Sequence, residues 1–338
     1  MDRPTIKDIA RVAGVSPGAV SFALNDRPGV SEQTRQRVKE VAHELGWTPS
    51  VAALALSARQ ARAVGLVIAR PEDSFTGERF FMQLIAGIER VLTAHSLSLV
   101  LQFANDLDDE IAAYRRWWAE QRVDGVILTD PRSDDPRPAA LKDLNLKAVF
   151  VGAQDVAALP SVRVNDAAAM ASLVDHFASL GHTRLAHVSG SADLWHTRRR
   201  RESFAQRCAE LAIEVMPTDS TDFTEAAGRA ATEQLLAAAQ QPTGIIFDNE
   251  VLAMGGMVAL VGHGCRVPDD VAIASFEDTP LCRIMRPEVT SLQRDPALLG
   301  AHGTTLLLQA IEGQEAPQTI VEPVMGIAVR GSTDPTKP

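Results

Sequence analysis

The chain has 338 residues, of which 46% are hydrophobic and 22% are charged. This balance is typical of a globular protein of two or three domains, and no stretch approaches the ~18 apolar residues of a membrane span. Three cysteines, Cys208, Cys265 and Cys282, are too few and too far apart for a disulfide framework or a zinc pattern. The first residues lack the apolar core of a signal peptide, so we expect a cytoplasmic protein without metal or cofactor.

The net charge of −10 is unevenly distributed along the chain. Residues 1–62 carry nine lysines and arginines against six acidic residues, which gives this segment a charge of +3 and the remainder −13. A small basic segment on an acidic body is typical of a DNA-binding module joined to another domain. The alternative is chance unevenness on a solvated surface, and the helix pattern of the same segment argues against it.

Two short helices are predicted at the N-terminus. Thr5 and Asp8 have the spacing of a capping box, and the apolar helical stripe that follows ends at Gly14, which suits a left-handed helix end. Ser16 and Pro17 then start a second helix, because serine caps a helix and proline fits its first position. Two helices joined by such a tight turn predict a helix-turn-helix.

The outward face of the second helix is made of Pro17, Gly18, Ser21, Phe22 and Asn25. Small residues let the helix N-terminus approach phosphates and base edges, and a phenylalanine can contact thymine methyl groups. Each of these residues also has a structural interpretation: the proline sets the helix start, the glycine avoids a clash, and the phenylalanine packs against a neighbour. We predict that this face binds DNA.

A third helix starts at Ser31 and ends at Gly46. Its apolar stripe completes a three-helix core. Ser31, Thr34 and Arg35 stand at its start, where backbone N–H groups and the helix dipole favour a phosphate.

From Val64 onward, apolar runs alternate with helical patterns, which predicts parallel strands joined by helices. The predicted strands are Val64–Ala69, Leu97–Leu101, Val123–Leu128 and Ala148–Val151, and then, after Pro160, Leu185–Val188, Ile213–Met216, Gly244–Phe247 and Val271–Phe276. The predicted helices are Phe80–Ala94, Asp109–Glu120, Ala167–Leu180, Arg199–Leu211, Glu225–Ala239 and Val251–Val261. Two successive alternating units predict two doubly wound α/β lobes with a ligand cleft between them.

Polar and aromatic residues follow the predicted strands, where such sheets bind ligands. They are Phe80, Phe81, Thr129, Asp130, His196, Arg200, Phe223, Asp248, Asn249, Glu250, Glu277 and Asp278. Carboxylates, amides and an arginine beside aromatic rings suit a polyol, because they bind paired hydroxyls while a ring stacks on the apolar sugar face. Taken singly, a carboxylate here is more often a helix cap and a phenylalanine more often core.

The first 57 residues resemble the lactose/galactose repressor (LacI/GalR) family. The matching stretches are TIKDIARVAGVS (5–16), AVS (19–21), VSEQTR (30–35) and ELGWTP (44–49). The resemblance implies a DNA-binding domain over 1–48, in which Thr5, Ser16, Pro17, Gly18, Ser21, Phe22, Asn25, Ser31 and Thr34 contact DNA. It also implies a hinge helix and linker over 49–62 whose Leu56 enters the minor groove as an apolar wedge. An ordinary linker helix is the alternative.

The resemblance continues through the body, at GHTRL (181–185), Arg200 and Phe204, Pro268, and the closing RGST (330–333). It implies a body of periplasmic-binding-protein type over 63–338, with lobe one at about 63–161 plus 291–318 and lobe two at about 162–290 plus 319–333. It also implies that a last long helix, Pro296–Ile311, returns to lobe one. The effector residues that it implies are Phe80, Phe81, Asp130, His196, Arg200, Phe223, Asn249 and Glu277.

Three classes of protein compete for this pattern. A periplasmic carrier has no use for the basic head, and an enzyme would need a nucleophile–base pair, metal ligands or a phosphate loop, none of which the sequence shows. A repressor explains both halves, so we expect a homodimer that binds a near-palindromic double-stranded DNA operator. The effector is expected to be a sugar. The alternative is a purine or another metabolite that acts as co-repressor.

Overall fold

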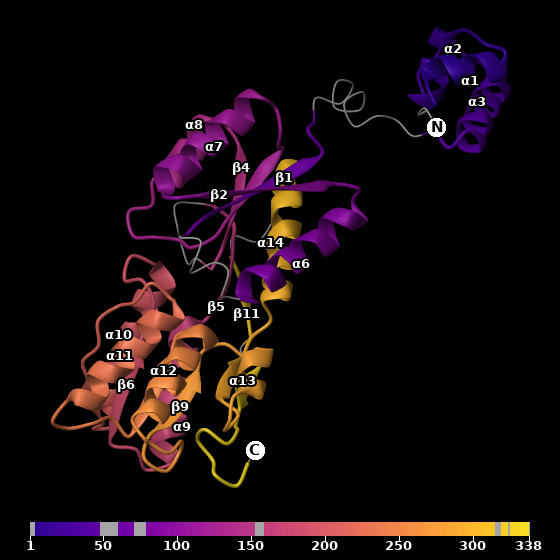
Figure 1. Ribbon diagram of the computed structural model, residues 1–338. Coiled ribbons are helices and arrows are strands. Elements are labelled where there is room, and N and C mark those ends of the chain that lie inside the picture. Colours follow the sequence, from indigo (N-terminus) through magenta and orange to yellow (C-terminus); the bar gives the residue numbers. More distant parts are fainter. Residues whose placement is uncertain are drawn as a thin grey trace. The chain divides into compact units, whose positions relative to one another are not determined.

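The computed structural model describes residues 4–47, 60–70, 79–152, 159–314, 319–323 and 325–337. The chain divides into two compact units, Met1–Ala61 and Arg62–Pro338, here called the head and the body (Figure 1). Most of the predicted hinge, including Leu56, lies outside the described residues. In the described ranges no helix combines the length and the apolar content that a membrane span requires.

The head is built from α1 (Ile6–Ala13), α2 (Pro17–Leu24) and α3 (Glu32–Glu44). The predicted starts are confirmed, because each helix begins directly after the predicted cap. Gly14 ends α1 with a φ of 66°, a left-handed conformation that glycine adopts without a steric penalty. The side chains that face one another in the core are Ile9, Ala13, Val20, Ala23 and Val38, all with 0% exposure.

Lobe one of the body is a six-stranded parallel sheet. Its strands, in spatial order, are β11 (Thr319–Glu322), β5 (Ser161–Val164), β4 (Lys147–Val151), β3 (Gly125–Leu128), β1 (Ala63–Ala69) and β2 (Ser98–Ala104). One face packs on α6 (Arg79–Ala94) and α14 (Pro296–Ile311), and the other on α7 (Leu107–Ala119) and α8 (Arg137–Asp143). Strands buried on both faces explain the continuous apolar runs in the sequence.

Lobe two repeats this arrangement (Figure 1). The order of its strands is β12 (Gly326–Ala328), β10 (Thr290–Gln293), β9 (Ala272–Ser275), β8 (Gly244–Phe247), β6 (Arg184–Val188) and β7 (Glu214–Met216), of which only β12 runs antiparallel to its neighbour. Its helices are α9 (Asp166–Ser179) and α10 (Trp195–Glu210) on one face, α11 (Glu225–Ala237) and α12 (Glu250–Gly262) on the other, and the short α13 (Pro280–Ile284). The predicted pair of doubly wound lobes is confirmed.

The limits of the lobes differ from those expected. β5 and β11 belong to the sheet of lobe one, and β10 belongs to the sheet of lobe two, so the chain passes between the lobes after Val164, after Gln293 and after Glu322. The expected limits, 161/162, 290/291 and 318/319, placed these short strands in the wrong lobes. They pair at the edge or in the outer half of each sheet, and each has two or more polar residues in four, so no apolar run marks them.

The last long helix returns to lobe one, as the resemblance implied, and packs along α6 (Figure 1). The two helices approach closely at Gly87, where an added Cβ would lie 1.9 Å from the carbonyl oxygen of Ala297. Because this obstacle is backbone, the contact tolerates no side chain. Strand β10 of lobe two is therefore followed by a helix that packs tightly on lobe one.

Candidate functional site

The three helix starts of the head are capped by hydroxyl groups. The Thr5 Oγ1 accepts from the Asp8 N–H at 3.4 Å while the Asp8 carboxylate accepts from the Thr5 N–H at 2.9 Å, which is the predicted capping box. The Ser16 Oγ accepts from the Ala19 N–H at 3.2 Å, and the Ser31 Oγ from the Thr34 N–H at 3.2 Å. These caps fix the N-terminal turns whose remaining N–H groups are available to phosphates.

The outward face of α2 is open to solvent. Pro17, Gly18, Phe22 and Asn25 are all exposed, whereas Ser21 is half-buried. Phe22 is 41% exposed, and one edge of its ring rests against Gly29, where an added Cβ would lie 3.0 Å from the ring. The ring is thus held by the turn that follows α2 and still presents apolar surface outward.

Two basic residues of α3 brace the turn between α2 and α3. The Arg35 guanidinium donates to the Asp26 carboxylate at 3.1 Å and to the backbone oxygen of Arg27, and the Lys39 ammonium lies 2.8 Å from the same carboxylate. Side-chain hydrogen bonds and charges from Lys39 and Arg35 lower the pKa of Asp26. The predicted role of Arg35 as a phosphate donor therefore competes with a structural one.

In the body, the predicted effector residues gather around one cavity between the lobes. Those that line it are Phe80, Asp130, His196, Arg200, Phe223, Asn249 and Glu277. Phe81 does not: its ring has 0% exposure and lies in the core of lobe one, behind the wall. Phe81 therefore supports the wall from behind in this arrangement, and its direct contact with an effector stays a prediction.

Arg200 is the buried centre of the lobe-two wall. Its Nε donates to Asp166 Oδ1 at 2.8 Å, its Nη1 lies 3.3 Å from Asp248 Oδ1, and its guanidinium stacks 3.7 Å from the ring centre of Phe276. Burial alone would lower the pKa of Arg200, but the two carboxylates outweigh it and raise the pKa. The guanidinium is thus a fixed, fully charged hydrogen-bond donor at the cavity.

Arg70 and Asp130 form the opposite wall, on lobe one. The Arg70 Nε and Nη2 donate to the two Asp130 oxygens at 2.5 and 2.8 Å. Burial opposes the charge of Asp130, yet Arg70 lowers its pKa below the ordinary value. The guanidinium also lies 4.7 Å from the ring centre of Phe223 and 5.1 Å from that of Phe81. An arginine of one lobe therefore covers the aromatic face offered by the other.

An unusual backbone conformation places the Phe223 ring at the cavity. Its φ is 70°, a left-handed value that is rare for an aromatic residue, and Asp130 across the cavity has a φ of 51°. The ring lies over Gly190, where an added Cβ would be 1.8 Å from the ring. Such backbone conformations persist only where the surroundings impose them, and they cluster at ligand sites.

Two further residues of the wall have shifted pKa values. Burial, together with the charge of Arg200, lowers the pKa of His196 to about 4, so its imidazole is neutral near pH 7 and can both donate and accept. Burial and the charge of Arg200 also lower the pKa of Arg294 to about 9. Arg294 pairs with Glu277, and its guanidinium lies 5.8 Å from the ring centre of Phe80.

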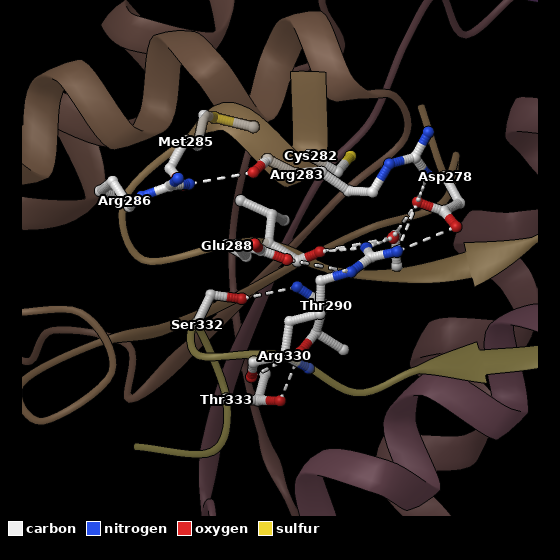
Figure 2. A network of polar contacts seen from close by, with 12 residues as sticks. Asp278, Cys282, Arg283, Met285, Arg286, Glu288, Thr290, Arg330, Ser332 and Thr333 are labelled. Atoms are coloured by element: carbon white, nitrogen blue, oxygen red, sulfur yellow. Dashed lines mark hydrogen bonds and ion pairs between the residues drawn. The ribbon is translucent and has the colours of Figure 1, made fainter. Parts of the chain in front are cut away.

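Asn249 and Asp278 make structural hydrogen bonds that the sequence did not predict. The Asn249 Oδ1 caps α12 by accepting from the Leu252 N–H at 2.8 Å. Asp278 does not line the cavity; its two carboxylate oxygens accept from the Arg330 Nη2 at 2.8 and 3.0 Å (Figure 2). Arg330 also donates to the Val289 oxygen, so the closing RGST segment anchors the loop that carries Glu277.

The lobes touch at the rim of the cavity. Arg132 and Leu194 form an antiparallel bridge, and the Trp195 N–H donates to the Pro131 oxygen at 2.8 Å. The Arg198 Nη1 donates to Ser133 Oγ at 2.5 Å. The cavity is partly open to solvent, and its free volume is only about 60 Å³, small beside the roughly 300–1,000 Å³ of typical ligand sites. The lining side chains thus leave little free space between the lobes.

Three charged residues of the lining were not predicted from the sequence: Arg70, Asp166 and Arg294. Each stands directly after, or one residue beyond, the end of a strand, namely β1, β5 and β10. Asp130 was predicted because it follows a strand, and the same criterion applies to Arg70. Asp166 and Arg294 follow short polar strands that the sequence did not predict, so their position at the carboxyl end of a strand was not recognised.

The comparisons agree with this architecture. Residues 5–50 match the family described as bacterial regulatory proteins, lacI family, and residues 174–333 match the periplasmic binding protein-like domain. A LacI family transcriptional regulator from Bifidobacterium animalis subsp. lactis is 30% identical, with 81% of this chain and 98% of that chain covered and a TM-score of 0.73.

Two further solved structures are similar over almost the whole chain. The Lac repressor dimer bound to operator and the anti-inducer ONPF has a TM-score of 0.86 and 25% identity, covering 98% of this chain and 99% of that one. A complex of the transcriptional regulator CelR with cellobiose has a TM-score of 0.74 and 26% identity, covering 98% and 100%. The chain belongs to the lacI family of bacterial regulatory proteins, as a transcriptional repressor with a helix-turn-helix head and a two-lobed body.

Proposed function

We propose that this repressor binds a small neutral polyhydroxy effector, a sugar, between its lobes, and that the effector switches its affinity for operator DNA. The observation that carries the proposal is the convergence of charged side chains and two aromatic rings, Phe80 and Phe223, from both lobes on one cavity. The CelR–cellobiose complex supports the class of ligand. As a bacterial regulator of transcription, the protein would act in the cytoplasm and, when bound to DNA, at the nucleoid.

The charges of the wall favour a neutral ligand. Three guanidinium groups (Arg70, Arg200, Arg294) face five carboxylates (Asp130, Asp166, Asp248, Glu250, Glu277), and His196 is neutral near pH 7. The excess of negative charge opposes an anion. Hydroxyl groups suit this wall, because each can donate to a carboxylate and accept from a guanidinium. Stacking on Phe223 requires the sugar to displace Arg70 from the ring.

Binding and DNA affinity are coupled in this proposal through the closure of the cleft. The cavity has little free volume, so an effector must change the separation of the lobes, and the segments that join the lobes at Asp166 and Arg294 would bend to allow it. An effector shifts the repressor between two states only by its differential affinity for them, and the operator must change effector affinity by the same factor. Titration of the effector with and without operator distinguishes an inducer from a co-repressor.

On the DNA side, the proposal assigns base contacts to Pro17, Gly18 and Phe22 and phosphate contacts to the capped helix starts. One short helix reads too few bases to be specific, so two heads bind two half-sites of a near-palindrome. Two heads require a homodimer. The edge strand β2 supports one, because its exposed Leu101 and Phe103 form an apolar sheet edge of the kind that pairs with another chain. The Lac repressor is itself a dimer on its operator.

A purine or other metabolite that acts as co-repressor is the second candidate. Phe80 lines the cavity and could stack on a flat ring, but Arg294 already lies over it and Phe81 is buried in the core. Of these two neighbouring rings, only Phe80 is therefore within reach of a purine in the cavity.

The test begins with selection of an operator from random duplex DNA by the full-length protein. Thermal-shift assays with cellobiose, D-galactose, D-ribose, adenosine and guanine then separate the sugar from the purine. The bound ligand is titrated by calorimetry with and without operator. We expect the two affinities to differ; equal values would leave a DNA-binding protein with a pocket but no switch, and the proposal would have to be abandoned.

A further inference from the structure

His187 lies outside the cavity yet is hydrogen-bonded to its wall. The imidazole is 4% exposed on β6, and its Nε2 lies 3.0 Å from Asp248 Oδ1, at the end of the neighbouring strand β8. On its other side the residue borders a separate surface pocket with Arg201 and Phe204. The His187 Nδ1 is buried and makes no hydrogen bond within the described part of the chain. The contact with Asp248 is thus the polar anchor of this ring.

Asp248 is held from three directions. Its Oδ1 accepts from His187 and faces the Nη1 of Arg200 at 3.3 Å, and its Oδ2 accepts from the Gly190 N–H at 2.9 Å. Burial would raise the pKa of this carboxyl, but His187, Arg200 and the Gly190 N–H outweigh it and hold the pKa well below its ordinary value. The carboxylate is therefore ionised, and His187 fixes the same oxygen that orients Arg200.

Arg200 is left with one edge for a ligand. Asp166 takes its Nε and Asp248 its Nη1, while its Nη2 makes no hydrogen bond to the described residues. Two anchored nitrogens and the stacking on Phe276 at 3.7 Å fix the plane of the guanidinium. A planar donor fork with a fixed plane recognises paired acceptors, such as neighbouring hydroxyl oxygens, far better than a freely rotating one.

We propose that His187 is a positioning residue for effector recognition: by donating to Asp248 it holds the carboxylate that aims the Nη2 edge of Arg200 into the cavity. The inference rests on the proposed function in one respect, the role of Arg200 as an effector contact. The alternative is that His187 has only a packing role beside Phe204, whose ring centre lies 5.3 Å away. In that case an apolar side chain of similar size would replace His187 without changing effector binding.

The test compares full-length variants at this one position. His187→Leu keeps the bulk and removes the donor, whereas His187→Gln carries an amide N–H at about the reach of Nε2. His187→Met is a second donor-free variant in case the leucine protein does not fold. Thr218→Val is the matched control, because the Thr218 hydroxyl donates to the backbone oxygen of His187 and leaves Asp248 untouched.

Crystal structures of these proteins give the first measurement, which needs no ligand. We expect the Arg200–Asp248 contact to persist in the wild type, His187→Gln and Thr218→Val and to be lost in the donor-free variants. An unchanged contact in His187→Leu or His187→Met overturns the inference.

Calorimetry with cellobiose and with adenosine gives the second measurement. We expect a ligand that binds the wild type to bind the donor-free variants about tenfold more weakly, as the loss of one hydrogen bond to a charged group predicts, and His187→Gln to restore most of the affinity. Wild-type affinity in His187→Leu also overturns the inference. If neither ligand binds the wild type, the proposed effector class fails, and the crystal structures alone decide the role of His187.

Discussion

Replacing Arg200 by methionine should destabilise the body strongly. The side chain is 4% exposed, and its partners Asp166 and Asp248 are 4% and 0% exposed, so the change leaves two carboxylates buried without their shared cation. Removal of one partner from a buried ion pair costs about 3–5 kcal/mol. Arg294, 4.0 Å from Asp166, and His187, 3.0 Å from Asp248, compensate in part, so we expect the lower half of that range.

For a domain of this size, such a loss lowers the melting temperature by about 6–16 °C. The measurement is urea unfolding and calorimetry of the full-length protein at pH 7.5. Arg199→Met is the matched control one position earlier on α10, because Arg199 is 43% exposed and pairs only with the exposed Glu202 among the described carboxylates. This control should change the free energy of unfolding by no more than about 0.5 kcal/mol.

The deficit of Arg200→Met should shrink in acid. In the wild type the pKa of Asp248 is depressed, so its stabilising effect is present above the unfolded value of about 3.9 and is lost only as pH falls toward the lower folded value. In the variant the two carboxylates repel each other, and protonation of one relieves the strain. Stability should therefore converge with the wild type between pH 7.5 and 5. A deficit as small as that of Arg199→Met, or one independent of pH, refutes the reasoning.

Three further outcomes follow from the same structure. Gly190→Ala places a Cβ 1.8 Å from the Phe223 ring, so it should displace the ring and weaken the binding of any sugar found by thermal shift, with unchanged operator affinity in anisotropy assays. Ser16→Ala removes the cap of α2 and should cost the head about 1 kcal/mol in thermal unfolding, whereas an unchanged melting curve would exclude a stabilising cap. Operator affinity should fall between 50 and 200 mM salt with a log–log slope of about −0.9 per phosphate contacted, and a flat line would contradict phosphate binding.

The local signals of the head were sufficient for its prediction. Thr5, Ser16 and Ser31 cap their helices, and the apolar stripes form the core, because a cap and a helical period depend on residues only three or four apart. The long helices and the strands with continuous apolar runs were predictable for the same reason. α14 has the predicted bounds, Pro296–Ile311, and β8 the predicted bounds, Gly244–Phe247.

The short polar strands could not be predicted from local patterns in the sequence. β5 (SVRV) and β10 (TSLQ) gain their strand structure from neighbours far away in the sequence, with which they share backbone hydrogen bonds. Nothing within four residues can report such a neighbour. Because these two strands were not predicted, the expected lobe limits were misplaced. Asp166 and Arg294 were not predicted as lining residues for the same reason, since each is recognisable only by its position just after a strand.

The pairing of charges within each wall of the cavity was equally unpredictable from the sequence, and it governs how the site selects a ligand. Arg70 pairs with Asp130 on the lobe-one wall, whereas Arg200 pairs with Asp166 and Asp248, and Arg294 with Glu277, on the other side. An effector that opens the cleft must replace every partner that it displaces, since a buried charge left unpaired costs more than one new hydrogen bond returns. A ligand that lacks one hydroxyl would leave one carboxylate or guanidinium unsatisfied, and a site built on buried polar groups rejects such analogues strongly. Selectivity thus arises from the charged pairs that already fill the cleft, because a ligand is accepted only if it can take over the hydrogen bonds they make with one another.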